Sequence, residues 1–381
     1  MKVLYYIHNS SYTEGSLMSL ISMVGYVKDS GVDVVIAANK DLNGTSMFND
    51  FCSSYGIAVY YIPVYLSFNR LPKGFKEKLL YSLWVIRAVR LKLKCAMALN
   101  KVVKKERPDI IHTNTGVLHE GLFVAKKHAI PHVWHLREYQ DLDFGRGIYP
   151  TKRIYEKLLK RSAAVITITE DIKRHFNLCE MQSAYVVYNG VCRAGRLQIN
   201  MPKQKCFLIA SRISKEKGIS EIIHEFIKFH NNNKEYDLLI AGEINDSNRS
   251  IVDKFKDEKY VKFLGWKSAD ELKLLMSNAL ALIVNSKCEG FGRMTAEAII
   301  NGCLVVGRDS GGTKEIFEKT GGGWAYNDYD EFQECLQSLV KMDDISYAEK
   351  IRNAQQIAND IFSVESNGAG VLDVYHKILK L

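Results

Sequence analysis

Short runs of apolar residues alternate along this chain with longer segments that have a helical period of apolar positions. The first series of runs predicts strands at residues 3–7, 34–38, 58–62, 110–112, 132–135, 164–167 and 185–187. A second series predicts strands at residues 207–210, 238–241, 261–264, 281–284, 304–307 and 323–326. Strands that alternate with helices are typical of parallel sheets covered by helices. We therefore expect an α/β protein.

The alternating pattern is interrupted once, between residues 191 and 205, where Gly195, Asn200 and Pro202 precede a new strand. A chain of 381 residues is long enough for two domains of ordinary size, each with its own core. We predict an N-terminal domain at 1–195, a C-terminal domain at 196–360, and a last helical segment at 361–381.

The composition is that of a globular protein, with 47% apolar and 25% charged residues. No run approaches the ~18 apolar residues that a membrane-spanning helix needs. The opening residues 1–7 are too short an apolar run for a signal peptide and are predicted to be the first strand. Eight cysteines occur without a Cys-x-x-Cys pair, which favours free thiols in a reducing compartment. We therefore expect a cytoplasmic location.

The net charge of +9 is concentrated in residues 70–107, which carry twelve Lys or Arg against two Glu. No Gly or Pro occurs from 75 to 107, so this segment is predicted to be one or two helices ended by Pro108. The predicted cationic face holds Arg87, Arg90, Lys94, Lys101 and Lys105, and the predicted packed face holds Val85, Val89, Ala96, Leu99 and Val103. Such a face suits an anionic membrane surface or a lipid-phosphate acceptor. The alternative is a solvated basic face. Nucleic acid is not expected as a partner.

The strongest chemical signal lies at residues 286–298, where two glutamates, Glu289 and Glu297, flank a Gly-x-Gly turn at 290–292. A predicted strand precedes this turn and a predicted helix follows it. Free N–H groups and the helix dipole make such a turn an anion site. Two carboxylates would repel a bound phosphate unless they face a hydroxylated part of the ligand, and a sugar meets that need. The alternative is that both are ordinary residues, one before a glycine turn and the other in the first turn of a helix.

A second signal follows the strand at 207–210, where Arg212 and Lys217 lie in a loop before a helix. A diphosphate is well matched by a planar guanidinium fork together with a compact ammonium. These two cations would offset the repulsion from Glu289 and Glu297. The alternative is that both are surface residues of an ordinary loop.

The Glu289 and Glu297 spacing resembles the Glu-x7-Glu signature of the family 4 glycosyltransferases, which are retaining enzymes of the GT-B fold. The resemblance implies two Rossmann-like α/β/α domains that face each other across a cleft, with the last helix returning to the first domain. It implies that Glu289 contacts the donor sugar and Glu297 the ribose of the nucleotide. The backbone of Gly290, Phe291 and Gly292 would border the sugar and the diphosphate.

The resemblance extends to other positions. Arg212 and Lys217 match the family element Gly/Ser-Arg-x4-Lys-Gly, and His135 matches a His-x-Arg-Glu motif whose His positions donor and acceptor. Four further positions are implied to contact the donor: Gly15, Ser16, Asn189 and Gly265. The alternative for His135 is a strand-end histidine bonded to its own loop.

The implied activity is retaining transfer of a hexose from a nucleotide diphosphate sugar, UDP-linked in preference to GDP-linked. The implied acceptor is a glycan or a lipid-linked molecule in cell-surface polysaccharide synthesis. Asp141-Leu142-Asp143 and Asp328-Tyr329-Asp330 satisfy the short Asp-x-Asp metal pattern, but we interpret them as loop acids. No cofactor and no essential metal are predicted.

Two other functions remain open. A sugar-nucleotide epimerase of the same fold would need carboxylates placed for elimination. A catalytically silent sugar-nucleotide-binding protein would recruit partners through the basic segment at 70–107. A Rossmann oxidoreductase is excluded because no Gly-x-Gly-x-x-Gly follows the first strand.

Overall fold

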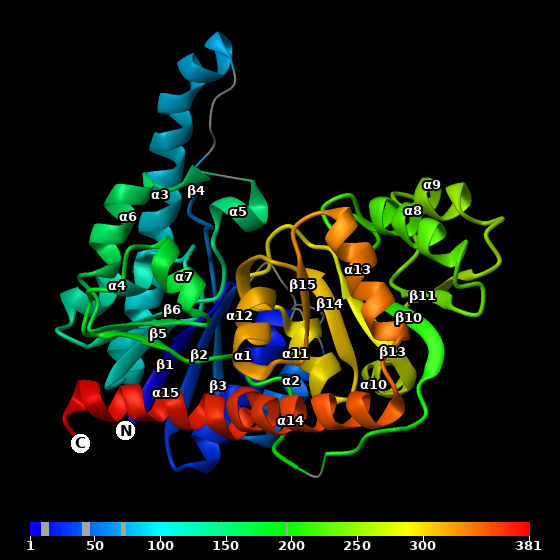
Figure 1. Cartoon of the computed structure of the whole chain (residues 1–381). Helices are drawn as coiled ribbons and strands as arrows, with labels where there is room; N and C mark the ends of the chain where they lie inside the picture. The colour runs from blue at the N-terminus through cyan, green and yellow to red at the C-terminus, as the bar shows by residue number, and fades with distance from the viewer. Residues whose placement is uncertain (9–14, 40–45, 70–73, 146, 196) are drawn as a thin grey trace. The chain divides into compact units, whose positions relative to one another are not determined.

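The computed structural model describes residues 1–8, 15–39, 46–69, 74–145, 147–195 and 197–381. The chain divides into two compact units, shown in Figure 1. Unit 1 comprises Met1–Gly190 with Val364–Leu381, and unit 2 comprises Val191–Ser363. The chain thus passes between the units at 190/191 and 363/364, whereas the sequence pattern placed the divisions after residues 195 and 360.

Unit 1 contains a parallel sheet of seven strands in the order β3-β2-β1-β5-β6-β8-β9. Its strands are β1 Lys2–Tyr6, β2 Asp33–Asn39, β3 Ala58–Ile62, β5 Ile110–Thr113, β6 His132–Leu136, β8 Ala164–Thr167 and β9 Ala184–Val186. The order reverses between β1 and β5. The central strands are buried on both faces, which explains why they appear in the sequence as nearly continuous apolar runs.

The helices of unit 1 are α1 Gly15–Asp29, α2 Ser46–Ser54, α3 Phe75–Glu106, α4 Glu120–Lys127, α5 Asp141–Phe144, α6 Lys152–Leu159, α7 Glu170–His175 and α15 Val364–Leu379. One core packs α1 and α15 against one face of the sheet, and a second packs α3 and α4 against the other face. The last helix, α15, packs tightly on α1. A Cβ atom added at Gly368 of α15 would lie only 2.2 Å from the Tyr26 ring of α1.

Unit 2 contains a parallel sheet of six strands in the order β12-β11-β10-β13-β14-β15. The strands are β10 Gln204–Ala210, β11 Asp237–Ala241, β12 Val261–Gly265, β13 Ala279–Val284, β14 Leu304–Arg308 and β15 Gly323–Tyr326. The helices are α8 Ile219–His230, α9 Arg249–Lys254, α10 Ala269–Asn278, α11 Arg293–Ile300, α12 Gly311–Thr320, α13 Tyr329–Val340 and α14 Asp344–Phe362. The order reverses between β10 and β13.

The prediction of two α/β domains with parallel sheets is confirmed, and every predicted strand is present. The pattern missed a small antiparallel pair in unit 1, β4 Phe68–Asn69 with β7 Gly147–Ile148, because two-residue strands leave no periodic signal. The predicted last helical segment at 361–381 corresponds to α15, which the extended residue Ser363 separates from α14. No helix among the described residues combines the length and the apolar character needed to cross a membrane.

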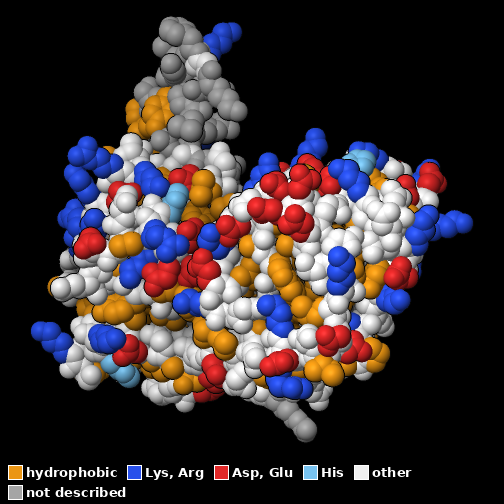
Figure 2. Space-filling view, viewed as in Figure 1, with side chains coloured by type: hydrophobic (Ala, Val, Ile, Leu, Met, Phe, Trp, Pro, Cys, Tyr) orange, Lys and Arg blue, Asp and Glu red, His pale blue; other side chains and the backbone are white. Residues whose placement is uncertain are grey.

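The basic segment forms a single helix, α3, which ends at Arg107 in the left-handed conformation before Pro108. One prediction about its faces is wrong, because Val89 was placed on the packed side and is 43% exposed. The buried residues of α3 include Ala88, Cys95, Leu99, Val102 and Val103. Figure 2 shows lysine and arginine side chains gathered around α3, α4 and α6, with hydrophobic side chains at the surface of α3.

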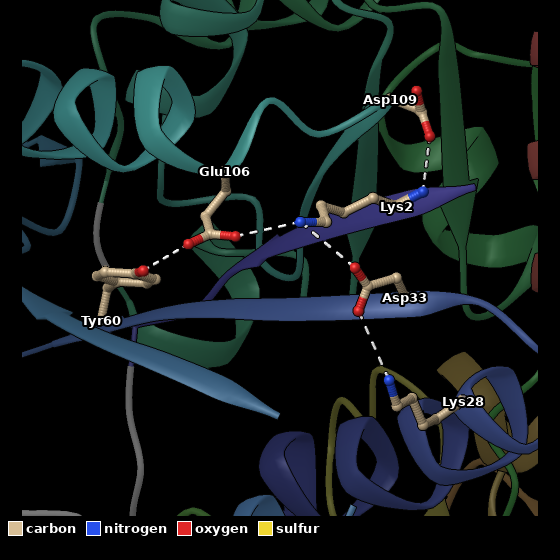
Figure 3. Close-up of polar contacts among 6 residues, drawn as sticks. All are labelled: Lys2, Lys28, Asp33, Tyr60, Glu106 and Asp109. Carbon is tan, nitrogen blue, oxygen red and sulfur yellow. Dashed lines mark hydrogen bonds and ion pairs between the residues drawn. The ribbon is translucent and has the colours of Figure 1, made fainter. Parts of the chain in front are cut away.

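Figure 3 shows a polar cluster that holds the end of α3 to the sheet of unit 1. Glu106 accepts from the hydroxyl of Tyr60 on β3 and lies 3.2 Å from the ammonium of Lys2 on β1. The same ammonium lies 3.3 Å from the carboxylate of Asp33 on β2. The cluster therefore ties three neighbouring strands to the last turn of the basic helix.

Candidate functional site

A cavity of about 180 Å³ opens in unit 2 between the carboxyl ends of β10 and β13. These are the two strands at which the strand order reverses. In doubly wound α/β folds ligands bind at this position, outside the carboxyl ends of the strands. Four predicted site residues line the cavity: Arg212, Lys217, Glu289 and Gly292.

Two helices begin at this cavity, α8 after β10 and α11 after β13. Each is preceded by a glycine with a positive φ, 61° at Gly218 and 83° at Gly292, a conformation that other residues rarely adopt. Neither helix has a side-chain cap in the part of the chain described. The positive ends of both helix dipoles therefore lie at the cavity, where they favour an anion.

Lys217 and Glu289 form an ion pair across the cavity, from the ammonium to Oε1 of the carboxylate. Both side chains are largely buried, with exposures of 21% and 24%. Arg212 is exposed at the same cavity. The structure thus brings together Arg212, Lys217 and Glu289, which lie in separate parts of the sequence. The sequence did not predict that Lys217 contacts Glu289 directly.

The loop that carries Glu289 rests on the start of α12. Gly312 N–H donates to the Glu289 carbonyl at 2.8 Å, and a Cβ on Gly312 would lie 2.0 Å from the Phe291 carbonyl oxygen. Only glycine allows this approach. Phe291 itself is buried, with its ring 5.6 Å from that of Phe362. The backbone of residues 289–292 is therefore held in one conformation.

The other predicted donor residues of unit 2 lie outside the residues that line this cavity. Glu297 pairs with Arg293 one turn earlier on α11, Nε to Oε1 at 2.7 Å. Gly265 ends β12, two strands from β10, with φ 70°, and the following Trp266 is 70% exposed. The structure therefore groups Arg212, Lys217 and Glu289 but not the whole predicted set. Gly290 lies in the same turn as Phe291.

Asn285 and Arg293 are among the cavity residues to which the sequence pattern assigned no role. Asn285 is buried, donates to the Gly218 carbonyl at 2.9 Å, and accepts from Arg308 at 2.9 Å and Tyr326 at 2.7 Å. It therefore fixes Gly218, the residue before α8, relative to the end of β13. In the sequence it directly follows a predicted strand and lies four residues before Glu289.

In unit 1, His135 lies inside β6 rather than beyond its end, and its side chain is fully buried. Its Nδ1 lies 3.2 Å from Nε2 of His112 on β5. Burial, together with the positive charge of Arg137, lowers the pKa of both histidines well below the usual value, so both rings are neutral at pH 7. His135 is thus bonded to a neighbouring strand, and not to its own loop.

Arg137 and Asn189 form a second buried group in unit 1. The guanidinium donates from Nε to Asn114 at 2.8 Å and from Nη1 to Oδ1 of Asn189 at 2.5 Å. The predicted donor residue Asn189 is therefore held by Arg137 directly before the chain leaves unit 1. Gly15 and Ser16 begin α1, and the preceding Glu14 lies outside the described residues.

Glu138 follows in the same motif, and its side chain is partly buried beside Thr115 and Gly116. Its Oε1 accepts from the Thr115 hydroxyl at 2.5 Å and from the Gly116 N–H at 2.8 Å. Burial raises the pKa of Glu138 to about 7, despite the two hydrogen bonds that favour the charged form. This carboxyl group therefore changes charge near neutral pH.

The Asp-x-Asp pairs serve local structure. Asp328 accepts from the N–H groups of Asp330 and Glu331 and caps α13, and Asp143 accepts from the N–H of Tyr139. Among the described residues no group of three or more His, Cys, Asp or Glu side chains could hold a metal ion. The prediction that no metal is essential remains a prediction.

Residues 19–193 match the family described as Glycosyltransferase Family 4, and residues 197–357 match that described as Glycosyl transferases group 1. The two matches follow each other and together take up most of the chain. The chain belongs to the family 4 glycosyltransferases. The resemblance seen in the Glu289 and Glu297 spacing is thereby confirmed.

Among the curated relatives of this chain are two with named activities. The alpha-monoglucosyldiacylglycerol synthase of Acholeplasma laidlawii is 26% identical over 267 residues, 59% of this chain and 66% of that protein. The O-antigen chain mannosyltransferase RfbU of Salmonella typhimurium is 30% identical over 202 residues, 49% of this chain and 53% of that protein. The chain spans about half to two thirds of the length of these relatives.

A solved structure shares the fold over nearly the whole chain. HepE of Anabaena in complex with UDP has a TM-score of 0.73 at 19% identity, covering 99% of this chain and 100% of that chain. The fold is therefore GT-B, as expected from the resemblance.

Proposed function

We propose that this chain is a retaining hexosyltransferase that transfers a sugar from a UDP-linked donor to a glycan or lipid-linked acceptor in cell-surface polysaccharide synthesis. The observation that carries the proposal is the cavity of unit 2, where Arg212, Lys217 and Glu289 meet two uncapped helix N-termini. Cations and N–H groups suit a diphosphate, and a carboxylate suits sugar hydroxyls.

The choice of donor and acceptor draws on the relatives. HepE of Anabaena binds UDP and UDP-glucose, which supports a UDP-linked donor. One named relative makes a glycolipid and another acts on the O-antigen chain, which supports a lipid-linked or glycan acceptor at the cell surface. The resemblance of the Glu289 and Glu297 spacing to the retaining family 4 enzymes supports retention.

The proposed chemistry is electrostatic. When the glycosidic bond breaks, negative charge grows on the leaving diphosphate, and Arg212, Lys217 and the first N–H groups of α11 stabilise it. Lys217 exchanges its partner Glu289 for a phosphate oxygen as the donor binds. Glu289 is then available to orient the sugar hydroxyls, and the acceptor hydroxyl attacks from the face that the diphosphate leaves. His135 and Asn189 in unit 1, together with Gly15 and Ser16, are proposed to contact the donor or position the acceptor.

The test measures UDP release and sugar transfer with UDP-sugars and extracted lipid acceptor. Lys217→Ala removes a charge-assisted contact worth ~1.5–3 kcal/mol, so we expect donor affinity to fall by about 10- to 150-fold. Glu289→Gln is expected to lower kcat by a similar factor, since a neutral amide orients hydroxyls less strongly. Product anomers, read by NMR, should retain the configuration of the donor.

A matched control is Lys262→Ala, which breaks an exposed ion pair with Asp237 elsewhere in unit 2. This variant should keep wild-type transfer. If Lys217→Ala and Glu289→Gln lowered thermal stability but left donor binding and transfer unchanged, the ion pair would be structural only and the proposal would fail.

We also propose that α3 places the protein at the cytoplasmic face of an anionic membrane. The described part of this helix exposes an apolar set, Leu83 62%, Ile86 50%, Val89 43%, Leu93 57% and Met97 59%, between exposed basic residues such as Arg87, Arg90 and Lys94. Apolar side chains flanked by cations suit the interface of an anionic bilayer. A basic face that only binds water would not need the exposed leucines.

A further inference from the structure

One buried amide, that of Asn285, connects the two sides of the cavity in unit 2. Asn285 directly follows β13, and Glu289 comes four residues later in the same loop. Its side-chain Nδ2 donates to the carbonyl of Gly218 at 2.9 Å. Gly218 directly follows Lys217, whose ammonium pairs with Glu289. The hydrogen bond therefore joins the loop of the cation to the loop of the carboxylate.

The other end of the amide is held by the next two strands of the sheet. Oδ1 of Asn285 accepts from Nε of Arg308 at 2.9 Å and from the hydroxyl of Tyr326 at 2.7 Å. Arg308 and Tyr326 are paired in register at the ends of β14 and β15. The guanidinium also lies 5.5 Å from the centre of the Tyr326 ring and 5.4 Å from that of the Tyr329 ring. Two aromatic rings therefore contact the cation that holds Asn285.

The partners decide which way the amide of Asn285 points. A guanidinium nitrogen can only donate a hydrogen bond, and a backbone carbonyl oxygen can only accept one. Oδ1 must therefore face Arg308, and Nδ2 must face Gly218. The flipped amide would set two donors together at one end and two acceptors together at the other, so one orientation alone satisfies the site.

The bond to Gly218 fixes the position of the loop, and α8 has its own first-turn bond. The Gly218 carbonyl also accepts from the N–H of Ile222 at 3.1 Å, within the first turn of α8. A Cβ at Gly218 would lie 2.3 Å from Nδ2 of Asn285, so the two residues approach as closely as glycine allows. Removal of the amide would thus leave the helix bond in place and release the loop before it.

We propose that Asn285 is the positioning residue of Lys217. By holding Gly218 against the end of β13, it keeps the Lys217 ammonium where it meets Glu289 and, when a donor is bound, the diphosphate. Arg308 and Tyr326 act through Asn285. The effect on the ion pair is independent of any activity, whereas the effect on donor binding rests on the proposed function.

The first test needs no ligand and measures the coupling between Lys217 and Glu289 in denaturant unfolding of the full chain. Lys217→Ala, Glu289→Gln and the double variant form a cycle that isolates the pair. We expect a favourable coupling in the wild-type background and its loss in the Asn285→Ala background. An equal coupling in both backgrounds, or none in the wild type, would overturn the proposal.

The second test measures UDP affinity by titration calorimetry. Asn285→Ala is expected to weaken UDP binding about tenfold, because one hydrogen bond that positions the cation is lost. In a Lys217→Ala background Asn285→Ala should have no further effect, since the residue through which it acts is gone. In an Arg212→Ala background the tenfold effect should persist.

A second variant, Asn285→Asp, keeps the size of the side chain and the contacts of Oδ1, but it sets a carboxylate oxygen against the Gly218 carbonyl. The UDP titrations are run with this variant also, so that the test stands if Asn285→Ala does not fold. Its added charge would weaken UDP binding in every background, whereas loss of positioning adds to that effect only where Lys217 is present.

The matched control is Gln355→Ala, which removes another buried amide of unit 2. Gln355 donates to the carbonyls of Gln198 and Ile300, both at 3.0 Å, the latter at the end of α11. This variant should lower stability and leave both the ion-pair coupling and UDP affinity unchanged.

The outcomes separate this proposal from the proposed function. If Lys217→Ala left UDP affinity unchanged, the proposed function would fail, and loss of the ion-pair coupling in Asn285→Ala would still support the positioning of Lys217. If Lys217→Ala weakened UDP binding but Asn285→Ala weakened it equally with and without Lys217, the proposed function would stand and the positioning role would be overturned.

Discussion

At the scale of single residues, the ionisable groups of unit 1 are governed by burial more than by pairing. The histidines at 112, 132 and 135 all have a pKa lowered by burial, and Glu138 has a pKa raised by burial. In unit 2 the cavity instead holds opposite charges in contact, Lys217 with Glu289. Unit 1 thus buries neutral imidazoles near the Arg137 guanidinium, whereas the cavity of unit 2 holds a cation paired with a carboxylate.

Glu138 gives a prediction for pH dependence. Its folded pKa of about 7 lies above the ordinary 4.5, so its contribution favours folding below pH 4.5 and is lost as pH rises through 7. We expect wild-type stability to fall relative to Glu138→Gln by about 2–3 kcal/mol between pH 5 and pH 8. Denaturant titrations at both pH values measure the difference.

The control is Glu349→Gln, which changes an exposed carboxyl group on α14 and should keep the wild-type dependence on pH. Parallel stability curves for the wild type and Glu138→Gln would show that Glu138 is ionised throughout this range in the folded protein. That result would contradict the prediction.

At the scale of elements, helices in both units depend on glycines that permit close contact. Gly312 lets α12 receive the loop of Glu289, and Gly368 lets α15 lie against Tyr26 of α1. Asn367 on α15 also donates to the Tyr188 carbonyl at 2.5 Å. The last helix is therefore fixed to unit 1 by packing and by hydrogen bonds, which places Tyr375 beside His112.

We predict that Gly368→Ala destabilises unit 1, although alanine is the better helix former by ~1 kcal/mol. The added Cβ would lie 2.2–2.8 Å from three atoms of Tyr26. One of them is the Cβ of Tyr26, so the backbone must shift. Overpacking costs ~1–3 kcal/mol, and we expect a net loss of about 1 kcal/mol in the free energy of unfolding.

Ala369, the exposed residue that follows Gly368 on α15, provides a control for helix propensity. Ala369→Gly changes helix propensity alone and should cost ~1 kcal/mol. If Gly368→Ala raised the melting temperature, propensity would outweigh packing, and the contact between α15 and α1 would be looser than the structure indicates.

At the scale of the whole molecule, the charge of +9 is carried by one segment of one unit, at residues 70–107. Lys92 is not part of the exposed set, because it lies 3.7 Å from the buried Glu120 and over the Tyr149 ring. The remaining basic residues of α3 border exposed apolar side chains. The proposed membrane surface thus combines electrostatic attraction, which salt screens, with burial of apolar side chains, which salt does not screen.

We predict that the full chain binds vesicles containing anionic phosphatidylglycerol more tightly than neutral phosphatidylcholine vesicles. Arg87→Gln with Arg90→Gln should weaken binding roughly 30-fold, at ~1 kcal/mol per basic residue. Leu93→Ser with Met97→Ser should weaken vesicle binding at low salt and also at high salt, because the apolar contribution remains when exposed charges are screened. Vesicle co-sedimentation measures both.

Lys256→Gln with Lys341→Gln makes the same change in net charge on exposed positions of unit 2, and this control should bind as the wild type does. Equal binding to neutral and anionic vesicles, or equal loss in the control, would identify the basic face of α3 as a solvated surface.

The sequence by itself determined the parallel sheets, the approximate division of the chain and the cluster of Arg212, Lys217 and Glu289. Strand periodicity, glycine turns and charged residues at strand ends are local signals, so they can be read without the fold. Only the tertiary structure decided which faces of α3 are buried, that Lys217 contacts Glu289, that Asn285 joins β13 to α8, and that Tyr375 reaches His112. These are contacts between residues far apart in the chain, and packing of the sheets and helices, rather than any local preference, determines them.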